Sequence, residues 1–242
     1  MMSPLQDQRQ QRVRTIFDRI AGRYDLLNRV ISFRLDSFWR RQVIKTLAIK
    51  GRDKSVLDVG TGTGDLALAA AREIGAKGKI VGLDFSPAML RIAQAKRSRK
   101  VYRGKTVYVL GTALAPPFKD QAFDAVMTAF VLRNVPDLDL FFSNAYRVLR
   151  PGGQFVTVDM FPPSGRPFSF FYSLYFYRLV PWIGAGLARD RGAYQYLSDS
   201  VRKFHAPETV ADLIRETGFV RVETQRYLRG AVCLHSGEKP TR

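Results

Sequence analysis

Apolar positions along the chain repeat with two periods that alternate in a regular order. Helical spacing occurs in the segments 10–19, 36–47, 66–74, 87–95, 138–149 and 207–217. Short apolar runs typical of buried strands occupy 55–59, 80–83, 107–110, 125–130, 154–158, 220–225 and 231–234. This alternation predicts an α/β fold: a Rossmann-like, doubly wound, mostly parallel seven-stranded sheet with helices on both faces.

Two segments lie outside the alternation. Residues 1–50 precede the first strand and are predicted to form an N-terminal helical lid. Residues 166–200 are rich in aromatic side chains and predict a helical insertion on the substrate side, before the last helix and strands. Because no repeat or Gly/Ser-rich linker divides the chain, we expect a single domain over 1–242.

A glycine-rich loop follows the first predicted strand and precedes a helix. It reads Asp-Val-Gly-Thr-Gly-Thr-Gly-Asp over residues 58–65, and glycines in this context let the backbone approach a ligand closely. A tight turn without a ligand is the alternative. A dinucleotide fingerprint would place glycine at Asp65. With Asp58, the local negative charge disfavours a pyrophosphate and favours a cationic ligand such as S-adenosylmethionine.

A second acidic residue ends the second predicted strand. Asp84 lies 20 residues beyond Gly64, where a carboxylate can accept both ribose hydroxyls. Its alternative role is to cap the helix that begins near residue 87, although Ser86 suits that role better.

Composition and charge narrow the class of protein. The one cysteine, Cys233, excludes an intramolecular disulfide and a cysteine-rich metal cluster, and two histidines argue against a catalytic metal. The polar N-terminus and the lack of a run of about 20 apolar residues predict a cytoplasmic protein. The net charge of +18 suits nucleic acid, an anionic membrane or an acidic substrate, but the basic residues are scattered and do not select among these.

Four further motifs give the chain a recognisable pattern. They are Tyr-Asp-Leu-Leu-Asn at 24–28 with Ser32 and Trp39, Leu-Arg-Asn-Val at 132–135, the segment 146–153 ending in Pro-Gly-Gly, and 190–194 with Tyr196, Leu197 and Ser200. With them the chain resembles the ubiquinone/menaquinone biosynthesis C-methyltransferase family over residues 13–237. The first two motifs are the most restrictive.

The resemblance implies transfer of a methyl group from S-adenosylmethionine to a ring carbon of a prenylated quinol. Arg133 would then stabilise a phenolate, Asn134 would hold a ring oxygen or an ordered water, and Tyr194 would line the ring pocket. The implied cofactor residues are Tyr24, Asp58, Gly60, Thr63, Gly64, Asp84, Phe85, Thr112, Ala113 and Ala129.

Each of these roles has a structural alternative. For Arg133 it is a salt bridge at the strand end, for Asp25 beside Tyr24 a helix cap, and for Tyr194 a place in the core. His235, on a closing strand, is expected to form a structural hydrogen bond.

The chain also departs from the family pattern and is predicted to be a divergent member. The family usually has histidine at Asp36, Glu-x-Ser at 159–161, Asn-Ala at 112–113 and serine at Ala129. A phospholipid N-methyltransferase and a catalytically silent S-adenosylmethionine-binding or RNA-associated protein therefore remain alternatives.

The aromatic segment 168–182 bears on partners. With Arg166, Arg189 and Arg191 at its flanks, it suits a membrane interface or an apolar tunnel for a prenyl tail. The excess positive charge would hold the protein peripherally on the anionic inner face of a membrane. No nucleic-acid partner is predicted, because no RNA-binding module is evident. A homodimer is left open.

Overall fold

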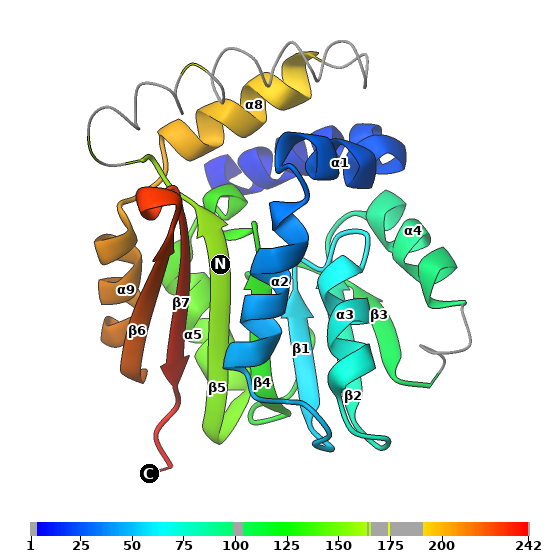
Figure 1. Ribbon diagram of the computed structural model, residues 1–242, viewed down its shortest axis with the longest axis vertical. Helices are drawn as coiled ribbons and strands as arrows, with labels where there is room; N and C mark the ends of the chain where they lie inside the picture. Colours follow the sequence, from blue (N-terminus) through cyan, green and yellow to red (C-terminus); the bar gives the residue numbers. More distant parts are fainter. Residues whose placement is uncertain (1–3, 99–103, 164, 166–173, 175–190, 242) are drawn as a thin grey trace.

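A seven-stranded sheet forms the centre of the computed structural model, which describes residues 4–98, 104–163, 165, 174 and 191–241 (Figure 1). The strands follow the order β3-β2-β1-β4-β5-β7-β6. Only β7 runs antiparallel to its neighbours, β5 and β6. The α/β prediction is confirmed. The strands are β1 (Ser55–Val59), β2 (Lys79–Asp84), β3 (Thr106–Leu110), β4 (Phe123–Ala129), β5 (Leu149–Met160), β6 (Val220–Tyr227) and β7 (Val232–Glu238).

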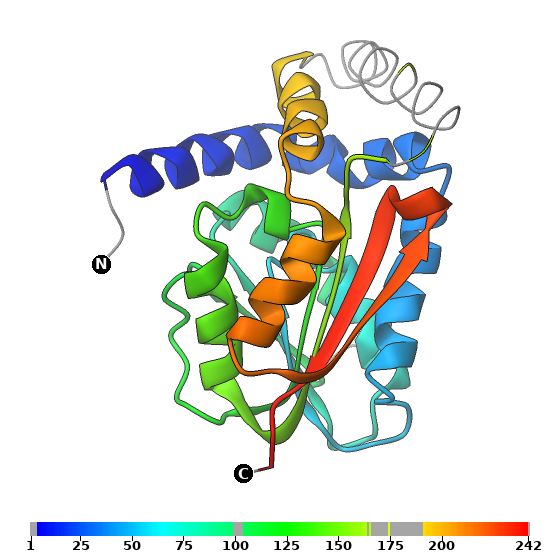
Figure 2. The ribbon, with the colours of Figure 1, turned by 90° about the vertical axis from the view of Figure 1, so that its left-hand side faces the viewer.

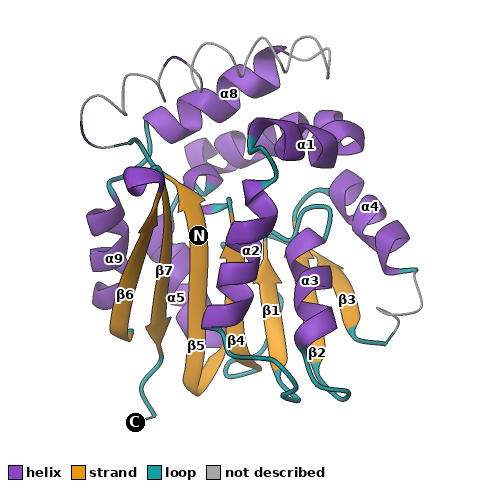
Figure 3. Ribbon diagram, viewed as in Figure 1, coloured by secondary structure: helices purple, strands orange, loops and turns teal. Residues whose placement is uncertain are grey.

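Helices cover both faces of the sheet, as predicted. Helices α2 (Leu35–Thr46) and α3 (Asp65–Glu73) lie on one face, and α5 (Leu138–Val148) and α9 (Pro207–Glu216) lie on the other (Figures 2 and 3). Strand residues alternate between the two cores, since Val56 and Met127 pack with α2 and α3 while Leu57 and Val126 pack with α5 and α9. Helix α4 (Pro87–Arg97) packs near β3.

Two helices lie across the carboxyl ends of the parallel strands. These are α1 (Pro4–Ile31) and α8 (Arg191–Arg202), which cross above the sheet in Figure 1. They share an apolar cluster to which α1 contributes Ile16, Ile20, Leu27 and Ile31. Because apolar residues continue to Ile31 at helical spacing, α1 extends well beyond the predicted segment 10–19. Asp25 therefore lies inside a helix, and its alternative role as a helix cap is wrong.

The predicted insertion is described only in part. Its residues 191–200 belong to α8, whereas 166–173 and 175–190, which include most of the aromatic segment 168–182, lie outside the described residues. In the part of the chain that the structure describes, no helix is long and apolar enough to span a bilayer.

Candidate active site

The glycine loop joins the carboxyl end of β1 to the first turn of α3. Gly60, Gly62 and Gly64 all have positive φ, a backbone conformation that L side chains rarely adopt. A Cβ at Gly60 would lie 2.5 Å from Val131, and one at Gly64 would lie 2.5 Å from the hydroxyl of Tyr108. A Cβ at Gly62 would meet nothing within 4 Å. The loop is thus held tightly at both ends and open at its centre.

Two buried carboxylates flank this loop. Asp58 accepts a 2.7 Å hydrogen bond from the hydroxyl of Thr61, and Asp84 accepts 2.8 Å bonds from the backbone N–H groups of Gly62 and Ser86. Burial is the largest effect on both: it raises the pKa of Asp58 to about 7 and that of Asp84 to about 6, against the lowering effect of these hydrogen bonds. A positive charge or a hydrogen-bond donor that approaches either carboxylate would favour its ionised form.

Ser86 caps α4, as expected, since its hydroxyl oxygen accepts a 3.1 Å hydrogen bond from the N–H of Met89. Asp84 is thereby left for another role at the end of β2. The capping alternative for Asp84 does not apply.

The loop opens into a narrow crevice that α1 covers. The crevice has a volume of about 40 Å³. It brings together Asn134 and five of the predicted cofactor residues, with Gln10 and Val13 of α1 opposite; the five are Gly60, Asp84, Phe85, Thr112 and Ala113. The side-chain N–H of Gln10 donates a 2.5 Å hydrogen bond to the hydroxyl of Thr112. Helix α1 therefore lies over the crevice as a lid.

Polar contacts tie this lid to the glycine loop and to α4. The Thr63 hydroxyl donates a 2.5 Å hydrogen bond to Asp25 of α1. Lys96 of α4 lies 2.5 Å from Asp25 and 2.6 Å from Asp65. The hydroxyl of Ser86 also donates to Asp18 of α1, at 2.5 Å. Thr63 thus orients the lid, and its side chain is committed to Asp25.

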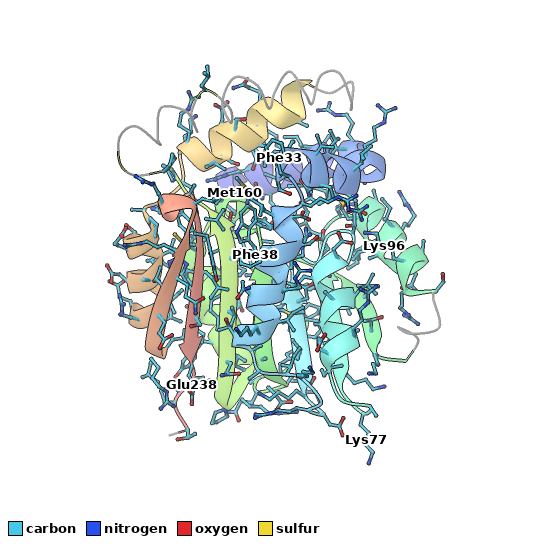
Figure 4. The ribbon with its side chains drawn as sticks, viewed as in Figure 1. Phe33, Phe38, Lys77, Lys96, Met160 and Glu238 are labelled. Carbon is cyan, nitrogen blue, oxygen red and sulfur yellow. The ribbon has the colours of Figure 1, made fainter. Side chains whose placement is uncertain are left out.

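A separate apolar cavity of about 330 Å³ lies beside the crevice. It opens among the end of α1, the start of α2, the ends of β4 and β5, and the 3-10 turn η4 (Leu228–Gly230). Tyr24 lines this cavity and not the crevice, and burial raises the pKa of its phenol. Figure 4 shows Met160 and Phe33 near each other at this place. The full lining is Tyr24, Asn28, Ile31, Ser32, Phe33, Leu35, Asp36, Trp39, Arg40, Phe130, Arg133, Met160, Leu197, Leu228 and Val232.

Asp36 is the one carboxylate among these lining residues. It is buried and forms an ion pair with Arg40, and it accepts a 2.9 Å hydrogen bond from the Ser32 hydroxyl. The resemblance noted in the sequence analysis would place histidine at this position. Both side chains can accept a proton.

A third opening, a groove of about 1010 Å³, lies between α1 and α8. Arg133 stands where this groove, the apolar cavity and the crevice meet. It belongs to the 3-10 turn η2 (Leu132–Asn134) and lines both the cavity and the groove, while its neighbour Asn134 lines the crevice. Its guanidinium forms a buried ion pair with Asp159, which is the salt bridge considered as an alternative. Its Nε is buried and has no hydrogen-bond partner among the described residues. At least one N–H of the guanidinium is thus left without a partner in the described part of the structure.

The other predicted residues are placed as follows. Tyr196 of α8 donates a 3.0 Å hydrogen bond to the side-chain oxygen of Asn134. Tyr194 lies in α8, and its side chain is outside the described part of the structure. Ala129 ends β4 but lines neither the crevice nor the cavity. The Nε2 atom of His235 lies 2.9 Å from the carbonyl oxygen of Pro207, which confirms its structural role.

Gln10, Val13 and Lys96 have site positions that the sequence did not indicate. Gln10 is 102 residues from Thr112 along the chain, so no local motif links the two. The pattern of polar and apolar residues predicted a helix over 10–19, but it does not indicate which strand ends the helix crosses.

Comparison with known proteins identifies the class and then the family. A crystal structure of an S-adenosylmethionine-dependent methyltransferase from Aquifex aeolicus matches the fold with a TM-score of 0.62 at 18% identity, covering 85% of this chain and 92% of that one. The fold is therefore that of the S-adenosylmethionine-dependent methyltransferases.

Sequence relatives are much closer. A demethylmenaquinone methyltransferase from Thermus thermophilus is 43% identical over 93% of this chain and 100% of its own length. A ubiquinone/menaquinone biosynthesis C-methyltransferase UbiE from Geobacter sulfurreducens is 40% identical over 95% of this chain and 89% of its own. The model of the ubiE/COQ5 methyltransferase family matches residues 5–239. The chain belongs to this family, and it is an enzyme that uses S-adenosylmethionine.

Proposed function

We propose that the protein methylates a ring carbon of a prenylated quinol, a precursor of menaquinone or ubiquinone. The observation that carries this proposal is the position of Arg133, between an apolar cavity that suits a ring with its tail and a crevice bordered by the glycine loop. Relatives that share more than a third of the sequence bear names of quinone methyltransferases.

The crevice residues fit the proposed methyl donor. The amino acid part carries a cationic ammonium group. Asp58, which is buried at the end of β1 and accepts a hydrogen bond from Thr61 of the loop, does not itself line the crevice but would provide the counter-charge. Asp84 would accept the ribose hydroxyls, and Phe85, Thr112 and Ala113 would border the adenine. Because the crevice measures only about 40 Å³, we expect Gln10 to leave Thr112 when the adenine enters.

S-adenosylmethionine supplies a methyl group that is already electrophilic on its sulfonium. The protein therefore has to align the ring carbon and raise its electron density. Loss of the neighbouring hydroxyl proton gives a phenolate, whose charge Arg133 stabilises. With the donor bound, the ring carbon would form a bond to the methyl carbon while the methyl–sulfur bond breaks, and the electron pair of the broken bond would stay on sulfur. Loss of the proton from the same carbon restores the aromatic ring.

Asp36 is our candidate for the acceptor of the hydroxyl proton. It is the carboxylate in the cavity lining, and neither histidine of the chain lines the cavity. The ion pair with Arg40 and the hydrogen bond from Ser32 hold its carboxylate in a fixed orientation. A positioned base of this kind typically contributes about 10²- to 10⁴-fold to a rate.

We further propose that the enzyme is a single cytoplasmic domain that contacts an anionic membrane peripherally, where its lipophilic substrate resides. The charge of +18 supports this attraction. A homodimer is a further proposal, which sedimentation velocity would test directly.

The deciding experiment is product identification. The purified protein is incubated with labelled S-adenosylmethionine and extracted membrane lipids. A labelled quinol with the new methyl group on carbon supports the proposal. A labelled phospholipid amine would favour the N-methyltransferase alternative. Cofactor binding by calorimetry without any labelled product would favour the catalytically silent alternative.

A further inference from the structure

The apolar cavity continues outward into exposed apolar surface. Phe33, Leu35 and Leu228 line the cavity and are also exposed, with Phe33 at 74% and Leu228 at 43%. We call these three residues the cavity mouth. Large apolar side chains at this exposure, joined to an internal cavity, are typical of surfaces that meet an apolar partner.

The backbone on both sides of the mouth adopts an unfavourable conformation. Phe33 and Arg34 have φ of 50° and 64°, and Leu228 and Arg229 have φ of 48° and 52°. In the part of the chain that the structure describes, these are the two places where consecutive non-glycine residues have positive φ. Such strain persists where the surroundings or the function require it.

Each of these two pairs, which we call the first and the second strained corner, consists of an exposed apolar residue followed by an arginine. Arg34 and Arg229 are both exposed, next to Phe33 and Leu228 in the chain. Phe38, itself 37% exposed, packs edge-on against Tyr227 at 5.8 Å between ring centroids and so links α2 to the second corner. Figure 4 shows Phe38 on α2 and Phe33 above it, near the end of α1. The two corners therefore form one apolar surface with arginines at its border.

A basic groove also contacts α2 and the end of α1. It has a volume of about 430 Å³ and is lined by five basic side chains and one carboxylate, that of Asp65. Two of the five also pair with carboxylates outside the lining, Arg40 with Asp36 and Lys96 with Asp25. The basic residues are Arg29, Arg40, Arg41, Arg72 and Lys96. Such an excess of positive charge attracts phosphate-bearing groups.

Together these features match the chemistry of a bilayer that contains anionic phospholipid. We propose that the protein docks on such a bilayer through the cavity mouth, with Phe33 and Leu228 inserted among the acyl chains and with Arg34, Arg229 and the basic groove against the headgroups. The inference rests on the proposed function only for its second part: the prenyl tail of the substrate passes from the bilayer into the cavity between Phe33 and Leu228.

The size of the cavity supports this route for the tail. At about 330 Å³ it lies at the lower end of the range for small-molecule sites. A ring fills much of this space, so a long tail has to continue through the mouth. If the mouth lies on the bilayer, the tail stays in an apolar environment throughout and the cost of exposing it to water is avoided.

The test is co-sedimentation with vesicles of phosphatidylcholine alone or of equal parts phosphatidylcholine and phosphatidylglycerol. We expect binding to the anionic vesicles. The double variant Arg34→Gln/Arg229→Gln should weaken it by about tenfold, because each basic residue near an anionic surface contributes severalfold. The double variant Phe33→Ser/Leu228→Ser should also weaken it, by loss of inserted apolar area.

Matched controls lie at the opposite end of the sheet. Lys77→Gln/Lys119→Gln removes the same charge from exposed positions, and Val220→Ser replaces an exposed apolar residue; Lys77 lies at the bottom of Figure 4. These variants should bind vesicles like the parent protein. Equal weakening by the lysine pair would show that only net charge matters and would overturn the proposal.

Two other outcomes separate this inference from the proposed function. The protein could bind vesicles through the cavity mouth and yet methylate no quinol. That result would support the docking surface and contradict the proposed function. If the parent protein binds no vesicles but forms a dimer, and Phe33→Ser abolishes that dimer, the surface belongs to a contact with a second copy. That result would overturn the inference. Arg34→Gln/Arg229→Gln should also retain turnover of a short-tailed, water-soluble quinol and lose turnover of a vesicle-embedded one.

Discussion

The hydroxyl of Thr63, in the glycine loop, lies 2.5 Å from a carboxylate oxygen of Asp25, in the lid helix α1. The same carboxylate pairs with Lys96 at 2.5 Å. These contacts join the segment expected to touch the methyl donor with the helix that covers it. The position of the lid is thereby coupled to the conformation of the loop.

Asp25→Ala should weaken binding of S-adenosylmethionine by roughly tenfold, since hydrogen bonds to charged groups contribute about 1.5–3 kcal/mol. Isothermal titration calorimetry measures this affinity. The control is Asp212→Ala, which removes an exposed carboxylate of α9 that pairs with Arg215, three residues further along the same helix. Unchanged affinity in Asp25→Ala would contradict the coupling.

Asp58 should make cofactor affinity depend on pH. Its pKa of about 7 in the folded protein means that much of it is protonated near neutrality. Because the ammonium group of the donor pairs with the ionised form, affinity should rise as the pH increases from about 6 to about 7.5, below the ordinary α-amino pKa of about 7.7–8.0. Asp58→Asn should remove most of this rise. A flat affinity profile in the parent protein would exclude Asp58 as the counter-charge.

The same residue should limit stability. The pKa of Asp58 lies above its ordinary value of 3.8, so the folded state holds the proton more tightly than the unfolded state. Asp58 therefore lowers the free energy of unfolding by an amount that grows from about pH 4 to about pH 7 and stays constant above about pH 7. Asp58→Asn should stabilise the cofactor-free protein at pH 8, by at most about 4 kcal/mol, and change little at pH 4. Urea unfolding at both pH values measures the difference.

Asp36 should act as the proton acceptor. Asp36→Asn should lower kcat by about 10²- to 10⁴-fold and leave cofactor affinity unchanged. Asp36→His should restore part of the activity, with an acid limb of the pH–rate profile near the ordinary imidazole pKa of about 6.5. Full activity in Asp36→Asn would rule out this role.

Arg133 should matter for a quinol and not for an amine. Arg133→Gln should reduce kcat on a quinol by about 10²-fold or more, because one preorganised donor to a developing oxyanion has this effect. A neutral amine forms no phenolate, so methylation of an amine should not need Arg133. If Arg133→Gln is as active as the parent protein, the phospholipid N-methyltransferase alternative is supported. Because removal of Arg133 leaves Asp159 buried without its partner, circular dichroism has to confirm folding.

Much of the fold and part of the site could be predicted because they depend on residues near each other in the chain. The alternation of periods gave the seven strands and their helices, and glycine at residues 60, 62 and 64 marked the loop at the end of β1. The acid at residue 84 could be placed beside that loop, since parallel strands present their carboxyl ends at one edge of a sheet.

Contacts between distant segments were decided by the tertiary structure alone. The ion pair of Arg133 with Asp159, the reversed direction of β7 and the lid contacts of Asp25 join residues that no local pattern links. The apolar cavity likewise takes its walls from α1, α2, two strand ends and η4. Periodicity reports which face of an element is buried, but the packing of the whole chain determines what that face meets.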